Sequence, residues 1–224
     1  MEFIANFFGA ILYHILNIVG NYGFAIIIFT ILVKILLTPL SIKQTKSTFV
    51  MSELSPKIKE IQEKFQNKPE KLNNEISKLY KEAKVNPLSG CLPLLIQMPI
   101  MYALFIVFKD PIAHGVFVDN ATFLLSIENF LWINSLSTPD YLLAILSGIS
   151  AFLMQKISTP KDQVQGPMKI MSLMVAGISV YSGLMFPAAL TLYWNISNIF
   201  SVLQYFTITN PLKKKLSMQK TVKQ

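Results

Sequence analysis

YGFAIIIFTILVKILLTPL, residues 22–40, is an apolar stretch in which Lys34 is the only charged side chain. A transmembrane helix needs about 20 predominantly apolar residues, so this stretch predicts a membrane span. A lysine at the centre of a spanning helix costs about 2.5–3.5 kcal/mol on insertion scales. We therefore take Lys34 as the first candidate for a functional side chain.

The composition extends this prediction to the whole chain. Of the 224 residues, 52% are hydrophobic and 14% are charged, and the mean hydropathy is +0.47, which is too apolar for an ordinary soluble domain. Four further apolar runs are candidate spans: 92–108, 141–157, 170–186 and 187–208. Pro187 separates the last two and suits the first turn of a helix. We expect an all-α polytopic membrane protein with five transmembrane helices.

The placement of charge predicts the topology. The net charge of +8 comes from 20 lysines, because the sequence contains no arginine. Eighteen of the lysines lie in three segments that fall on one side if five helices alternate: 41–91, 156–169 and 213–223. The opposite connection, 110–140, holds four acidic residues and no lysine. The positive-inside rule then predicts a multi-pass membrane protein with its N-terminus outside and its C-terminus in the cytoplasm.

Two segments flank the first predicted span. Residues 1–20 are apolar but carry Asn6, His14 and Asn17 at helical spacing, which indicates an amphipathic helix lying in the outer interface. Residues 41–91 contain two amphipathic stretches on either side of the breaker QNKP, so we expect a cytoplasmic antiparallel helical hairpin.

The role of the basic segments stays open at this stage. The hairpin is either a solvated linker or a basic module that contacts lipid headgroups or a partner, with Lys57, Lys59 and Lys64 as candidate recruitment residues. The fifth helix is expected to end at Asn210–Pro211, leaving residues 209–224 as a basic cytoplasmic tail. Its cluster Lys213, Lys214 and Lys215 suits ribosomal RNA or anionic lipid, although ordinary positive-inside anchoring explains it equally well.

Polar side chains recur inside the predicted spans. Thr30 and Thr38 lie one helical turn on either side of Lys34 and share its face. The other members are Gln97 in the second span and Thr191, Tyr193, Trp194, Asn195 and Asn198 in the fifth. Because none of the five spans contains Asp or Glu, this set predicts a hydrated cavity that remains positive. Two simpler interpretations stay open: Lys34 snorkels to the headgroups, and the two aromatic residues belong to an outer aromatic belt.

We expect no enzymatic activity. The sequence has no phosphate-binding glycine loop, no H-E-x-x-H, no G-x-S-x-G and no carboxylate pair at depth, and we expect no cofactor. One cysteine and two histidines make a metal site improbable. The alternative function from a different class is a small-solute or anion transporter with Lys34 as its binding site, which would require helix breaks in two corresponding halves.

Three blocks resemble the YidC/Oxa family of membrane protein insertases. They are YGFAIIIFTILVKILLTPLSIKQ, LSPKIKEIQEKFQNKPEKLNNEISKLYKEAKVNPLSGCLPLLIQMP and FPAALTLYWNISNIFSVLQ. The resemblance implies an insertase core over residues 21–208 with a hydrophilic groove in the membrane. It places Lys34 where the family has a basic residue, usually arginine, and it places Thr30 and Trp194 where family members contact the arriving client helix.

The resemblance also implies partners and shows departures. The implied partners are nascent membrane proteins with one or two spans, the ribosome, anionic lipids, the Sec translocon and the signal-recognition-particle receptor. Lysine in place of arginine keeps the charge but loses the planar fork of donors. The large extracytoplasmic domain of Gram-negative members and the lipoprotein signal of many Gram-positive members are not found, so we expect a compact, Gram-positive-like form.

Overall fold

The computed structural model describes residues 2–66, 68–83, 85–86, 92–158 and 167–221, which are mostly helical. The chain divides into two compact units, one formed by Met1–Leu37 with Gln97–Tyr205 and the other by Thr38–Ile96 with Phe206–Gln224. Residues 87–91 of the predicted hairpin segment and 222–224 of the predicted tail lie outside the described residues.

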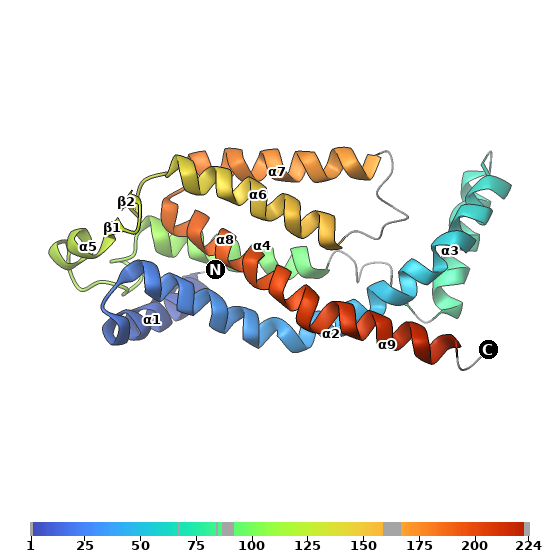
Figure 1. Ribbon diagram of the computed structural model, residues 1–224, viewed down its shortest axis with the longest axis horizontal. Coiled ribbons are helices and arrows are strands. Elements are labelled where there is room, and N and C mark those ends of the chain that lie inside the picture. The colour runs from blue at the N-terminus through green and yellow to red at the C-terminus, as the bar shows by residue number, and fades with distance from the viewer. Residues whose placement is uncertain (1, 67, 84, 87–91, 159–166, 222–224) are drawn as a thin grey trace. The chain divides into compact units, whose positions relative to one another are not determined.

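The first unit contains most of the apolar helices (Figure 1). In chain order the elements are α1 (Glu2–Val19), the first part of α2 (Tyr22–Lys64), α4 (Leu92–Lys109) from Gln97 on, α5 (Asn120–Ile127), β1 (Glu128–Phe130), β2 (Ile133–Ser135), α6 (Tyr141–Ser158), α7 (Pro167–Met185) and α8 (Ala188–Gln204). A helix therefore occupies each of the five predicted spans, and Pro187 is the N-cap of α8.

Three helices of the described residues are long and apolar enough to cross a membrane: α1, α2 and α6. The segments Leu95–Lys109 and Ser172–Met185 are shorter apolar helices. The count of five spans therefore stays a prediction, as does the interfacial position of α1.

The core of the first unit includes one face of α1. Ala5, Phe8, Leu12 and Ile15 are buried at helical spacing, whereas His14 on the other face is exposed. Phe8 meets Phe29 of α2 edge to face, with ring centroids 5.3 Å apart. One apolar face of α1 thus packs against the rest of the first unit.

Small residues allow α6 and α7 to lie side by side (Figure 1). A Cβ on Gly183 of α7 would come within 2.7 Å of the Cα of Ala144 and 2.8 Å of its Cβ. The hydroxyl of Ser147 donates to the carbonyl oxygen of Ser179 across the same seam, at 2.8 Å. Close approach through glycine, alanine and serine is a common way for helices to pack in membranes, where lipid supplies no hydrophobic drive.

The connection between α4 and α6 holds the one departure from an all-α fold that the described residues show. β1 and β2 form an antiparallel hairpin in which Glu128 pairs with Ser135 and Phe130 pairs with Ile133. Strands of three residues are too short to reveal period-two alternation in a sequence, so the all-α prediction missed them.

The second unit contains the rest of α2, then α3 (Pro69–Glu82), and α9 (Asn210–Thr221), which follows the π-helical turn η3 (Tyr205–Thr209). The break at QNKP is confirmed, because α2 ends at Lys64 and α3 begins at Pro69.

The basic tail expected after the fifth helix is itself helical: α9 begins at Asn210 and continues to Thr221. Pro211 lies in the first turn of α9, where a missing backbone N–H costs no hydrogen bond.

Candidate functional site

Lys34 of α2 is joined to α8 by a hydrogen bond. The Lys34 side chain is partly buried, and its Nζ donates to the Ser201 Oγ at 3.1 Å. The Ser201 hydroxyl in turn donates to the carbonyl oxygen of Ser197 at 2.8 Å. A hydroxyl that gives its proton to its own helix presents a lone pair to the ammonium group. The ammonium of Lys34 is therefore directed toward α8.

The two threonines of the predicted stripe differ in exposure. Thr30 is fully buried, and its hydroxyl donates to the carbonyl oxygen of Ile26 at 2.7 Å. Thr38 is partly buried, and its carbonyl oxygen accepts from the hydroxyl of Ser41 at 2.8 Å. The hydroxyl of Thr30 thus satisfies its hydrogen bond within its own helix.

Gln97 and Tyr193 form a second link to α8. The Nε2 of Gln97, on α4, donates to the hydroxyl of Tyr193 at 2.9 Å. Tyr193 is 1% exposed, so its phenol needs a partner of this kind. The amide of Gln97 is partly buried.

The polar face predicted for α8 packs against α6. The Nδ2 of Asn195 donates to the carbonyl oxygens of Leu143 and Thr191, at 3.2 and 3.0 Å. The Ser150 hydroxyl donates to the Asn195 Oδ1 at 3.1 Å and accepts from the Asn198 Nδ2 at 3.1 Å. Ser150 therefore connects both asparagines of α8 to α6.

Ser150 and Ser201 were missed in the sequence. The available signal for Ser201 was its position three residues after Asn198, which continues the polar face of α8 by one turn. Ser150 follows Ser147 by three residues on α6 and offered a similar signal. Serine is common in membrane helices as a packing residue, so these positions did not stand out.

Trp194 lines a cavity of about 60 Å³ inside the first unit. The other lining residues are Met101, Ser147, Ser179, Ser182, Gly183, Phe186, Leu190 and Thr191. The Nε1 of Trp194 is buried and has no hydrogen-bond partner among the described residues.

The predicted recruitment lysines belong to the second unit. Lys57, Lys59 and Lys64 are exposed, and the Nζ of Lys64 lies 5.7 Å from the ring centroid of Phe65.

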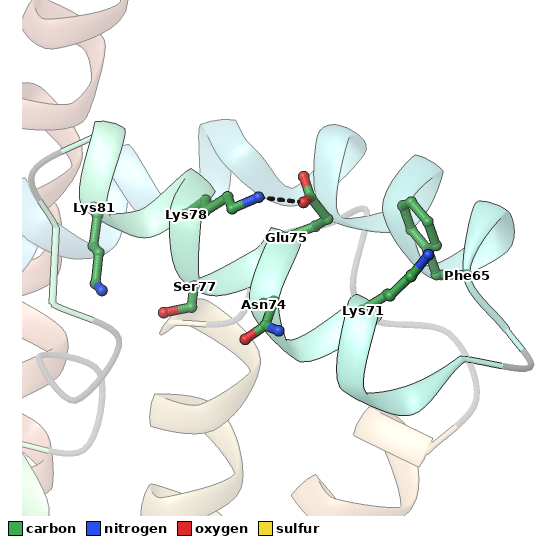
Figure 2. A pocket seen from close by; sticks show the side chains of 7 residues that line it. All are labelled: Phe65, Lys71, Asn74, Glu75, Ser77, Lys78 and Lys81. Atoms are coloured by element: carbon green, nitrogen blue, oxygen red, sulfur yellow. Dashed lines mark hydrogen bonds and ion pairs between the residues drawn. The ribbon is translucent and has the colours of Figure 1, made fainter.

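A pocket of about 550 Å³ in the same unit lies beside α3 (Figure 2). Its lining is Phe65, Lys71, Asn74, Glu75, Ser77, Lys78 and Lys81. The Lys78 Nζ lies 2.7 Å from the Glu75 Oε1, and this hydrogen bond raises the pKa of Lys78. The basic side chains on this face of α3 were not singled out in the sequence.

The basic cluster of the tail is helical. Lys213 of α9 is partly buried, and burial lowers its pKa. Lys214 and Lys215 are exposed on the same helix.

A family model and individual relatives point to the same family of membrane proteins. The family described as 60Kd inner membrane protein matches residues 14–215. The chain is 39% identical over 211 residues to "Membrane protein insertase YidC" of Clostridium perfringens (strain 13 / Type A), covering 90% of this chain and 84% of that relative. It is 41% identical over 203 residues to "Membrane protein insertase YidC 2" of Listeria innocua serovar 6a, covering 88% of this chain and 67% of that relative.

Other relatives are longer. "Membrane protein insertase YidC" of Chlorobium luteolum is 40% identical over 208 residues, which are 86% of this chain and 34% of that relative. A solved structure described as "Active YidC insertase crystal structure with the first transmembrane domain resolved" has a TM-score of 0.69 and 26% identity, covering 92% of this chain and 46% of that one. The chain therefore belongs to the YidC family of membrane protein insertases, and it is a multi-pass protein of the cell membrane.

Proposed function

We propose that this protein inserts newly made membrane proteins into the bilayer through a hydrophilic groove that contains the positive charge of Lys34. The observation that carries the proposal is the Lys34–Ser201 hydrogen bond, which directs a partly buried ammonium toward α8 at 3.1 Å. The five predicted spans hold no acidic side chain, so the positive charge suits a negatively charged visitor. The activity is not enzymatic and requires no ATP.

The driving force in this proposal comes from the client. About 20 apolar residues at roughly −0.3 to −0.6 kcal/mol each supply on the order of 6–12 kcal/mol when a client helix enters lipid. The barrier is the polar segment that must cross, because each charged residue costs about 3 kcal/mol at mid-bilayer. A hydrated groove shortens the dry part of that path. Lys34 would lower the barrier further by attracting acidic residues of the crossing segment.

Exposure separates the proposed groove residues into two kinds. The side chains of Lys34, Gln97, Trp194 and Asn198 are partly exposed and are our candidates for direct client contact. Thr30, Tyr193 and Asn195 are buried and hydrogen-bonded, so we assign them to the wall that holds the groove in shape.

The remaining parts of the proposal concern topology and partners. We propose five spans with the N-terminus outside, the C-terminus inside, and α3 with the end of α2 as a cytoplasmic helical hairpin that receives the nascent chain. The basic face of α3 and Lys213–Lys215 of α9 would contact the ribosome or anionic lipid. The Sec translocon and the signal-recognition-particle receptor are further proposed partners.

The test is insertion of a short two-span client into liposomes that contain only the purified protein. We expect protease protection of the translocated segment without ATP and without Sec components. Insertion no better than into empty liposomes would refute the proposal. An anion flux in the same liposomes would then favour a transporter.

Substitutions of Lys34 test its role in insertion. We expect Lys34→Arg to retain insertion, Lys34→Gln to reduce it and Lys34→Glu to reduce it most, with the largest losses for clients whose crossing segment is acidic. Ser201→Ala should weaken the response to client charge, and Ser201→Thr, which keeps the hydroxyl, should restore it. Equal insertion of acidic and neutral clients by the Lys34→Glu protein would contradict electrostatic attraction.

A further inference from the structure

The turn between β1 and β2 presents two large apolar side chains outward. Leu131 is 68% exposed and Trp132 is 47% exposed, and together they form the two-residue turn that follows Phe130. An exposed Leu-Trp pair at the tip of a hairpin is a poor choice for an aqueous loop, where turn residues are usually polar or glycine. The Leu-Trp pair suits a surface that can bind an apolar side chain and an amphipathic indole side by side.

The backbone conformation of the turn disfavours leucine, which indicates that the side chain of Leu131 has a role at this position. Leu131 has φ 56°, in the left-handed region that two-residue hairpins normally fill with glycine, asparagine or aspartate. Asn129, at φ 56°, is a residue that tolerates this conformation. Leucine has no such tolerance, so its place at the tip carries a conformational penalty that a glycine would avoid. A favourable environment for the isobutyl group would offset that penalty.

The base of the hairpin is fixed to α2. Phe130 is 3% exposed and meets Phe24 edge to face, with ring centroids 5.2 Å apart. Gly23 has no side chain to obstruct this ring, and a Cβ there would collide with the Phe130 ring. Ile133, on the other side of the turn, is 1% exposed. Both flanking residues are thus held in the core, while Leu131 and Trp132 between them are exposed.

The hairpin lies at the level where the apolar helices begin. The N–H groups of Ala188 and Ala189, which open α8, donate to the carbonyl oxygens of Thr138 and Leu136, each at 2.9 Å. Phe24, the contact of Phe130, is in the first turn of α2, and Tyr141 is the first residue of α6. In a multi-pass membrane protein the ends of apolar helices mark the boundary between hydrocarbon and headgroups.

The first turns of α2 and α6 also carry exposed apolar side chains. Exposed apolar side chains follow α2 and α6 from their first turns inward: Phe24, Ile28, Tyr141, Leu142, Ile145 and Ile149. Tryptophan and tyrosine concentrate at membrane–water interfaces because the ring is apolar and its polar atom reaches water.

We propose that the β1–β2 turn is a membrane anchor, in which Leu131 and Trp132 insert into the phospholipid interface beside the first turns of α2 and α6. The anchor holds the connection between α4 and α6 against the bilayer. It depends on the protein's place in the membrane and not on the proposed insertase activity.

The first test is quenching of tryptophan fluorescence by brominated phosphatidylcholine. The protein has two tryptophans, so Trp194→Phe leaves Trp132 as the only reporter. In reconstituted vesicles we expect bromines near the headgroup end of the acyl chains to quench Trp132 strongly and bromines near the chain ends to quench it weakly. Quenching by aqueous acrylamide together with none by any brominated lipid would overturn the proposal.

The second test does not depend on Trp194. Spin labels are attached in a Cys91→Ala background at Leu131→Cys, Trp132→Cys and, as the matched control, Asn134→Cys, an exposed polar position of β2. We expect the labels at 131 and 132 to collide more with oxygen than with a water-soluble nickel chelate, and the label at 134 to show the reverse. Equal accessibility at all three positions would refute the anchor. Dipolar broadening between labels at 131 of different molecules, without lipid contact, would assign the turn to a contact between copies instead.

Discussion

Gly183→Ala adds one methyl group to the closest approach of α6 and α7. The new Cβ would lie 2.7 Å from the Cα of Ala144, 2.8 Å from its Cβ and 3.2 Å from the Cγ2 of Thr191. The first of these neighbours is backbone, which cannot move away by rotating a side chain. We therefore expect the two helices to separate. Gly177→Ala, on the same helix, is the matched control, because its Cβ would have no neighbour within 4 Å among the residues that the structure describes.

The expected magnitude follows from two terms. Alanine is favoured over glycine inside a helix by about 0.8–1 kcal/mol, and this term is common to both variants. Overpacking a well-packed core typically costs about 1–3 kcal/mol, and only Gly183→Ala has this term. Because the helix propensity cancels, the two free energies of unfolding should differ by about 1–3 kcal/mol. That difference corresponds to about a 5- to 150-fold change in the unfolding equilibrium.

The assay is reversible unfolding of the purified protein from mild detergent into sodium dodecyl sulfate, followed by helical circular dichroism. We expect Gly177→Ala to unfold at the same or a higher denaturant fraction than the unsubstituted protein, and Gly183→Ala at a lower one. Equal stability of the two variants would show that α6 and α7 do not approach at Gly183, and would refute the packing derived for this seam.

Two further predictions concern polar groups. Ser150→Ala should destabilise the protein by about 1–3 kcal/mol in the same unfolding assay, because it removes the shared partner of Asn195 and Asn198, whereas Ser150→Thr should lose less. Asp119 accepts from the Thr122 N–H at 2.8 Å and from its hydroxyl at 2.9 Å, which lowers the Asp119 pKa below its ordinary 3.8. Since the folded-state pKa is depressed, this stabilisation is present above about pH 3.8 and is lost as the pH falls through the folded value. Amide exchange at Thr122 should therefore speed up on acidification, corrected for intrinsic rates, and Asp119→Asn should abolish that dependence.

The positions of the helices could be read from the sequence because local composition decides them. Long apolar runs without acidic residues became α4, α6, α7 and α8 with ends within a few residues of those expected, and the QNKP break separated α2 from α3. The departure lies beyond Pro211, where we expected a basic arm. Proline is tolerated in the first turn of a helix, and α9 begins at Asn210.

The candidate site was only partly predictable. The spacing of polar residues identifies the polar face of a helix, but it does not identify the residues of other helices that this face contacts. The polar faces around Lys34 and Asn195 were visible in the sequence, and the resemblance to the insertase family gave them a function. Which of their groups are free to act depends on contacts between residues distant in the sequence. Thr30 is closed off by burial and by a bond to its own helix, and Asn195 is used to hold α6.

The sequence by itself therefore determined the membrane location, the order and approximate ends of the helices, and the presence of Lys34 within the first predicted span, because each follows from local hydropathy and charge. Only the tertiary structure decided that the Lys34 ammonium meets Ser201, 167 positions away, and that a strained leucine stands at the tip of an outward-facing turn. These outcomes depend on which helices pack together, and no local pattern encodes a partner at that separation.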